Sequence, residues 1–150
     1  MAENNNHLVG RLPKKPHPLL KTLEPLIGKW KITGPDIEGE TSYEWMEGGF
    51  FFIQKFDLQQ QGQQKGIEYT GFDEETGTLR SRMMAIDGSR FTYTYEMDGD
   101  TLWYWFGDKG SDIYSRSTFS DDFSSYTGAW HWTNEDGTAG GYEFTATRIE

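Results

Sequence analysis

Ten short runs rich in β-branched and aromatic residues follow one another from Gly28 to the C-terminus, and turn-forming residues close each run. Runs of this kind are typical of β-strands. The predicted strands cover residues 28–34, 39–46, 49–59, 64–73, 77–86, 89–97, 100–107, 111–119, 124–133 and 139–149. No connection is long enough for a crossover helix, so successive strands must run antiparallel. The sequence therefore predicts an all-β fold, an antiparallel up-and-down β-barrel of about ten strands.

The connections between the predicted strands carry specific turn residues. Asp-Gly pairs stand at residues 87–88, 98–99 and 136–137. Glycine and aspartate tolerate the positive φ angles that tight hairpins require, so these pairs predict primed two-residue turns.

The N-terminal segment differs from the rest of the chain. Residues 1–17, with three consecutive Asn and a Pro- and Lys-rich stretch, are predicted to be a disordered tail. From Pro18 onward, leucines recur with the spacing of one helical face, and Pro25 limits this helix to about two turns. We therefore expect a short amphipathic helix leading into one barrel domain over residues 18–150.

Charge and composition exclude several classes of function. The net charge is −10, and after Lys31 the chain carries 22 acidic but only eight basic residues, which argues against nucleic acid as a partner. The basic residues of the tail are expected to contact a polyanion or to lie on the acidic barrel. There is no cysteine, no apolar stretch typical of a signal peptide and no long apolar run. A cytoplasmic protein without a membrane partner is expected.

Alternation along the strands predicts which side chains face inward, because residues two apart share a face of a strand. In the fourth run the more apolar Ile67 and Tyr69 are expected inside, with Glu68 outside. In the seventh run Tyr104 alternates with Trp103 and Trp105, and the pattern does not decide. The expected wall is aromatic and almost uncharged, suited to a small hydrophobic or aromatic, largely neutral ligand. The candidate ligand-binding residues are Tyr43, Trp45, Gln54, Tyr69, Met83, Tyr93, Tyr95, Tyr104, Trp130 and Tyr142. The alternative is that these rings fill the barrel and leave no usable space.

Several motifs resemble a known superfamily. Gly28-Lys29-Trp30 opens the first strand after a short helix, and Arg148 lies in the inward phase of the last strand. This combination resembles the calycins, which include the lipocalins and fatty-acid-binding proteins. The resemblance implies that Trp30 closes one end of the barrel and that Arg148 stacks on it. Residues 45–51, 66–73 and 118–122 are more narrowly similar to small, uncharacterised bacterial lipocalin-like proteins, for which no activity is implied.

The sequence offers little for nucleophilic or metal chemistry. His131 is the only histidine outside the predicted tail, so neither a Ser-His-acid relay nor a multi-histidine metal site is expected. Nitrobindin-like barrels hold haem through a single histidine. Here Trp130 and Trp132 are predicted to face inward, which places His131 in solvent and argues against haem. No catalytic residue, metal ligand or cofactor is predicted.

Two further interpretations remain open. A carboxylate in a dry aromatic pocket would serve as a general base in an isomerase, cyclase or hydrolase. Alternation places Glu44 and Glu68 outside, which leaves only acidic residues at the rim, such as Glu47, Asp73 and Asp87. Alternatively, Phe51 with Ile53, or Trp103 with Trp105, would supply an exposed apolar patch for a protein partner or a homodimer.

Overall fold

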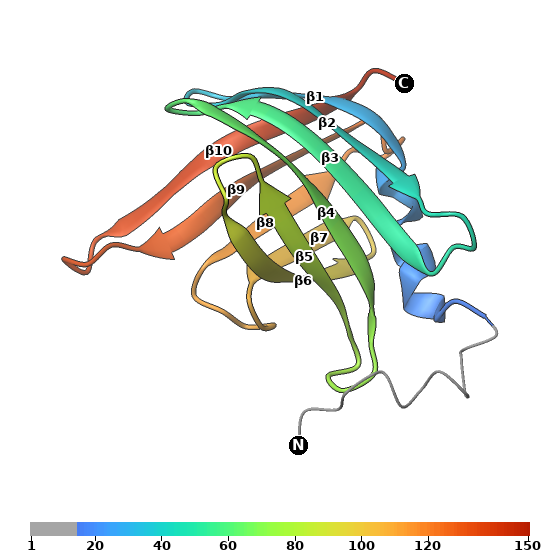
Figure 1. The fold of residues 1–150 in the computed structure, drawn as a ribbon. Coiled ribbons are helices and arrows are strands. Elements are labelled where there is room, and N and C mark those ends of the chain that lie inside the picture. The colour runs from blue at the N-terminus through green and yellow to red at the C-terminus, as the bar shows by residue number, and fades with distance from the viewer. Residues whose placement is uncertain (1–14) are drawn as a thin grey trace.

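The structure, a computed structural model, describes residues 15–150, which form a closed barrel of ten antiparallel strands (Figure 1). The strands are β1 (Gly28–Thr33), β2 (Glu38–Trp45), β3 (Phe51–Gln59), β4 (Gln63–Asp73), β5 (Thr78–Ala85), β6 (Arg90–Asp98), β7 (Thr101–Phe106), β8 (Tyr114–Phe119), β9 (Ser125–Thr133) and β10 (Ala139–Arg148). Each strand pairs with the next, and β1 also pairs with β10, which closes the barrel. The predicted fold class is confirmed, and the largest boundary difference is at β8, which begins at Tyr114 instead of residue 111.

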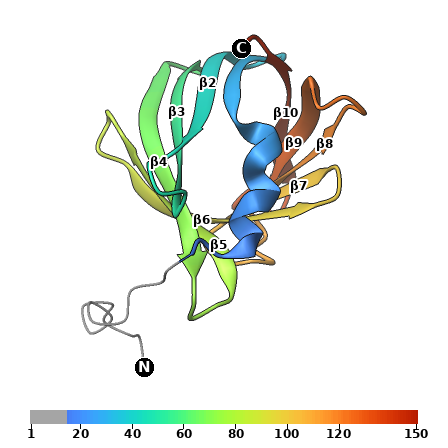
Figure 2. The same cartoon turned by 90° about the vertical axis from the view of Figure 1, so that its right-hand side faces the viewer.

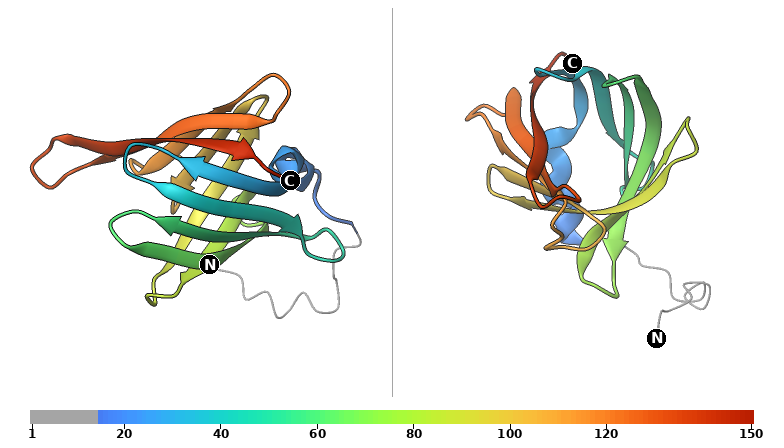
Figure 3. Two further views of the ribbon diagram at one scale, coloured as in Figure 1. Left: turned by 90° about the horizontal axis from the view of Figure 1, so that it is seen from above. Right: turned by 90° about the vertical axis from the view of Figure 1, so that its left-hand side faces the viewer.

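A short helix crosses one end of the barrel. It is η2 (Pro18–Leu26), which lies in front of the barrel in Figure 2. The right-hand view of Figure 3 faces the opposite end, and no helix of residues 15–150 crosses it there. The helix is of the 3₁₀ type, with three residues per turn, so Leu20, Leu23 and Leu26 align on one face and are buried. The sequence pattern was interpreted with the roughly 3.6 residues per turn of an α-helix, which places Leu19 on the same face. In the 3₁₀ helix Leu19 lies off this face and is exposed.

The covered end is sealed by Trp30 and Arg148. Trp30 is completely buried, and its indole N–H donates to the carbonyl oxygen of Leu26 at 2.8 Å. The Arg148 guanidinium lies 4.2 Å from the Trp30 ring centroid and donates to the carbonyl oxygens of Ile27 and Pro25 at 2.5 and 2.7 Å. One cation thus stacks on the indole and satisfies the end of η2. The predicted pairing of Trp30 with Arg148 is confirmed.

Gly28 allows this close approach. Its φ is +129°, and a Cβ at this position would lie 2.6 Å from a guanidinium nitrogen of Arg148 and 2.5 Å from the carbonyl oxygen of Glu150. Any larger residue would displace the last strand or its arginine. This steric constraint explains the glycine of the Gly-x-Trp motif.

The hairpin turns differ in one respect from the prediction. Gly88 and Gly137 have positive φ, but Asp87 and Asp136 do not. The N–H of Gly88 donates to the carbonyl oxygen of Ala85, and Gly137 contacts Asn134 in the same way. This pattern is a type I turn followed by a left-handed glycine, whereas the predicted type I′ turn needs positive φ at both central residues.

Inner and outer faces follow the predicted alternation on most strands, with one reversal. On β4, Glu68 and Thr70 are buried inside, and Tyr69 is exposed on the outer face. The predicted orientation of β4 was therefore wrong. On β7, where alternation did not decide, Leu102 and Tyr104 point inward, and the rings of Trp103 and Trp105 stack outside at 5.4 Å.

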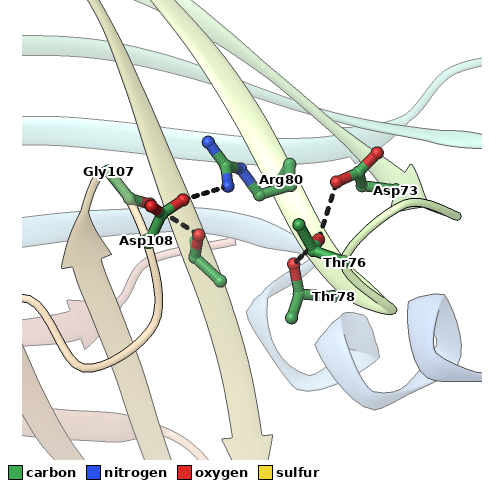
Figure 4. A network of polar contacts seen from close by, with 7 residues as sticks. Asp73, Thr76, Thr78, Arg80, Gly107 and Asp108 are labelled. Atoms are coloured by element: carbon green, nitrogen blue, oxygen red, sulfur yellow. Dashed lines mark hydrogen bonds and ion pairs between the residues drawn. The ribbon is translucent and has the colours of Figure 1, made fainter. Parts of the chain in front are cut away.

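Polar contacts on the outer surface connect the loop after β7 to its neighbours (Figure 4). Arg80 of β5 pairs with Asp108 at 2.5 Å, and the Thr94 hydroxyl donates to the carbonyl oxygen of Gly107 at 2.6 Å. Because Asp108 is mostly exposed, solvent weakens this ion pair and we assign it little stabilising energy.

Most of the predicted tail, residues 1–14, lies outside the described part of the chain. His17, at its end, accepts a hydrogen bond from the backbone N–H of Leu19 at 3.1 Å and stacks on Phe72 with 3.6 Å between ring centroids. Over residues 15–150, no helix has the length and apolar character needed to cross a bilayer.

Trp30→Ala is expected to lower the free energy of unfolding by about 3–5 kcal/mol, because it leaves a large cavity and removes the surface on which Arg148 stacks. Reversible urea denaturation measures the change. Ile86→Ala is the control, since Ile86 is 66% exposed and its loss should change stability by less than about 0.5 kcal/mol. A loss below about 1 kcal/mol in Trp30→Ala would contradict the sealing role.

Candidate functional site

The barrel contains a cavity of about 200 Å³ between the sealed end and the open end. Its lining residues are Ile32, Ile37, Thr41, Tyr43, Gln54, Phe56, Leu58, Gln64, Glu68, Met83, Tyr93, Tyr95, Leu102, Tyr104, Ser115, Ser117, Tyr126, Trp130, Tyr142 and Phe144. Tyr43, Glu68 and Tyr95 are buried, whereas Met83 and Trp130 are partly exposed and Gln64 is exposed. This gradient places the mouth on the side of Gln64 and the polar residues deeper inside. The rings therefore do not fill the barrel completely.

Eight of the ten predicted ligand-binding residues line this cavity. They are Tyr43, Gln54, Met83, Tyr93, Tyr95, Tyr104, Trp130 and Tyr142. Trp45 points inward but packs on Phe52, with ring centroids 5.3 Å apart, and does not line the cavity. Tyr69 lies on the outer face, 36% exposed, so the prediction that it faces the cavity was wrong. Contact with a ligand stays a prediction for the eight.

Glu68 is the residue that the sequence analysis misplaced, and it is the most distinctive group in the cavity. Its side chain is 1% exposed, and Tyr104 donates a hydrogen bond to Oε1 at 2.6 Å. The Ser81 hydroxyl donates a short hydrogen bond to Oε2. A carboxylate has about four acceptor positions, so these two donors leave capacity for another group.

Burial changes the acidity of this carboxyl group. Loss of hydration raises the pKa of Glu68 from its usual 4.5 to about 7, although hydrogen bonds from Ser81 and Tyr104 oppose the shift. Burial also raises the pKa of Tyr104 and Tyr95 well above 10, and the nearby charge of Glu68 adds to this. The tyrosines therefore remain protonated donors, and Glu68 is the group that titrates near neutral pH.

A second group of polar side chains lies beside Glu68. Gln54 donates to the hydroxyl oxygens of Thr41 and Tyr43 at 2.8 and 3.1 Å, and its Oε1 accepts from Tyr95 at 3.4 Å. Gln54 is directly opposite Glu68 across the β3–β4 pair. A polar layer thus crosses the barrel interior within an otherwise apolar wall. Within residues 15–150, no buried polar side-chain atom lacks a partner.

Tyr104, which donates to the carboxylate, belongs to a cluster of four aromatic rings. Tyr104 lies 4.5 Å from both Tyr93 and Tyr95, measured between ring centroids, and 5.3 Å from Trp130. Trp130 meets Tyr104 and Tyr93 edge to face, with interplanar angles of 68° and 63°. These rings give the cavity a wall suited to a planar or compact apolar group.

The inward orientation of Glu68 follows from the pairing of β4 with β3 and not from the hydrophobicity of β4 alone. On β3, Gln54 was correctly predicted to face inward, and it is the partner of Glu68. Paired residues on adjacent strands share a face, so this register turns Glu68 inward. Alternation gave the wrong orientation for β4 because Ile67 and Tyr69 are more apolar than Glu68 and Thr70, the residues of this strand that face inward.

The other candidate groups lie elsewhere. Glu44 is on the outer face, as predicted, and pairs with Lys55 at 3.4 Å. His131 is exposed outside the barrel beside Tyr114, with 4.9 Å between ring centroids, so its predicted orientation is confirmed. In the described range, no cluster of three or more His, Cys, Asp or Glu side chains could hold a metal ion. The predicted homodimer contact stays a prediction.

Comparison with known proteins supports the fold and nothing narrower. No family model matches the sequence, and no curated protein matches it. Among solved structures, the chain is similar to Rv2717c from M. tuberculosis, with 11% identity, a TM-score of 0.57, and coverage of 91% of this chain and 100% of that chain. At this identity the similarity shows a shared fold alone.

Glu68 predicts a specific pH dependence of stability. Between the ordinary pKa of 4.5, taken for the unfolded state, and the folded pKa of about 7, the folded state holds a proton that the unfolded state has lost. The free energy of unfolding should therefore fall as pH rises through this window, by about 3 kcal/mol in total relative to Glu68→Gln. Urea denaturation of both proteins from about pH 4 to about pH 8 measures the difference. A difference independent of pH would show that the Glu68 pKa is not raised.

Proposed function

We propose that this protein reversibly binds a small hydrophobic or aromatic molecule inside the barrel. The observation that carries the proposal is the cavity itself, about 200 Å³ in volume, lined mainly by aromatic and aliphatic side chains. Binding sites for small molecules are typically concave and apolar with a few polar groups, and drug-sized ligands need about 300–1,000 Å³. The ligand is therefore smaller than a drug-sized molecule.

The polar layer sets the orientation of this ligand. Its apolar body lies between Tyr93, Tyr104 and Trp130, and its polar end points toward Glu68 and Gln54. A wholly apolar molecule would leave this end of the cavity without a partner, which costs free energy once water is displaced. The earlier expectation of a largely neutral ligand rested on an uncharged wall, and Glu68 removes that premise.

The architecture favours assignment to the calycin-like barrels. The Trp30 and Arg148 seal is the arrangement that the resemblance implied, and the ten-stranded meander is compatible with it. We keep this assignment, and the cytoplasmic location expected from the sequence, as part of the proposal.

Glu68 also favours a second candidate function, proton-transfer catalysis. A carboxyl group with a pKa of about 7 in a dry aromatic site is suited to general acid–base chemistry. The test is deuterium exchange in small lipophilic ketones dissolved in D₂O, followed by NMR. An enzyme of this kind would accelerate exchange beside the carbonyl, and Glu68→Gln would not. Binding without exchange would support the carrier function alone.

A matched pair of variants tests the cavity. Met83 lines it, whereas the adjacent Met84 is 41% exposed on the outer face. Met83→Trp should weaken binding of the neutral single-ring probe 2-phenylethanol by at least about tenfold, because the larger ring occupies the space. Met84→Trp should leave the affinity unchanged.

Isothermal titration calorimetry of wild type and both variants measures these affinities. Equal affinity of the two variants would place the probe outside the barrel. Failure of wild type to bind any small lipophilic probe would overturn the proposed function.

A further inference from the structure

The cavity wall contains one acidic side chain and no basic one. Among its lining residues, all within the described chain, Glu68 is the only acid, and there is no lysine, arginine or histidine. The ion pairs found in residues 15–150 involve other residues, on the outer surface. Glu68 therefore has hydrogen-bond donors but no cationic partner inside the barrel. When ionised, it leaves one uncompensated negative charge in a region of low polarity.

The aromatic wall around this charge suits a positive ligand. The Tyr93, Tyr104 and Trp130 rings lie within 4.5–6.3 Å of one another, and Tyr104 also donates to Glu68. Ring faces attract ammonium groups, most strongly where water is excluded. A carboxylate ligand would meet repulsion from Glu68, and a neutral ligand would leave its charge unbalanced. The acidic surface of the barrel adds a weaker, longer-range attraction for cations.

We propose that the ligand is a small organic amine, bound as an ammonium ion with its charge beside Glu68 and its apolar body against Tyr93, Tyr104 and Trp130. This inference rests on the proposed function and names the ligand class for the same cavity. Ammonium and carboxylate then neutralise each other inside the barrel, so the ligand supplies the cation that the wall lacks. The cavity volume of about 200 Å³ restricts the body to a single ring or a short chain.

The experiment compares three probes of almost equal shape: 2-phenylethylamine, 2-phenylethanol and phenylacetate. Isothermal titration calorimetry measures the affinity of each at about pH 8, where Glu68 is ionised. The amine should bind at least about tenfold more tightly than the alcohol, and the acid should bind most weakly. In Glu68→Gln, which keeps the side-chain shape, the amine should lose this advantage while the alcohol keeps its affinity.

A pH titration of wild type gives a second readout that needs no variant. Below the Glu68 pKa, amine affinity should fall about tenfold per pH unit, because protonation removes the counterion. The affinity of the alcohol should not change over the same range.

The outcomes separate the inference from the proposed function. If the alcohol binds but the amine binds no tighter than the alcohol at about pH 8, the cavity is a binding site and the ammonium inference is wrong. An amine advantage that persists in Glu68→Gln would also overturn it. If no probe binds wild type, the proposed function itself fails.

Discussion

The pairing of the first strand, β1, with the last strand, β10, closes the meander into a barrel that encloses a cavity. β1 and β10 pair through residues such as Trp30 and Arg148, which lie directly opposite each other. The guanidinium stacks on the indole and also holds the carbonyl oxygens at the end of η2, so one side chain joins the last strand, the first strand and the helix. Because the seal lies at one end, the remaining interior stays available for a cavity at the other.

The interior combines two opposing physical demands. Apolar and aromatic side chains stabilise the barrel by leaving water, whereas Glu68, Gln54 and the tyrosine hydroxyls must keep hydrogen-bond partners there. The hydroxyl groups of Ser81 and Tyr104 donate hydrogen bonds to the Glu68 carboxylate, yet they do not neutralise its charge. An ionisable group retained in this position costs stability at neutral pH, and such a cost is common where a protein uses the group for recognition or chemistry.

Local sequence rules predicted the framework well and the centre of the site poorly. Turn residues and β-propensity located every strand, and the alternation of β6 placed Tyr93 and Tyr95 correctly in the cavity wall. The reversal on β4 arose because a barrel interior is not uniformly apolar, so hydrophobicity put Tyr69 inside in place of Glu68. Register with β3 carries the correct answer, but it is a property of two strands together. The 3₁₀ form of η2 was missed because Leu20, Leu23 and Leu26, each three residues apart, fit one face of either kind of helix.

Glu68 is an isolated, titratable carboxyl group that faces the cavity. The most direct measurement is a ¹³C NMR titration of the Glu68 side-chain carboxyl carbon in the folded protein, assigned by its absence in Glu68→Gln. We expect a midpoint of about 7, well above the usual 4.5, because burial disfavours the charged form. A midpoint near 4.5 would mean that Glu68 is hydrated or paired with a cation, contrary to its burial beside neutral donors in the cavity wall.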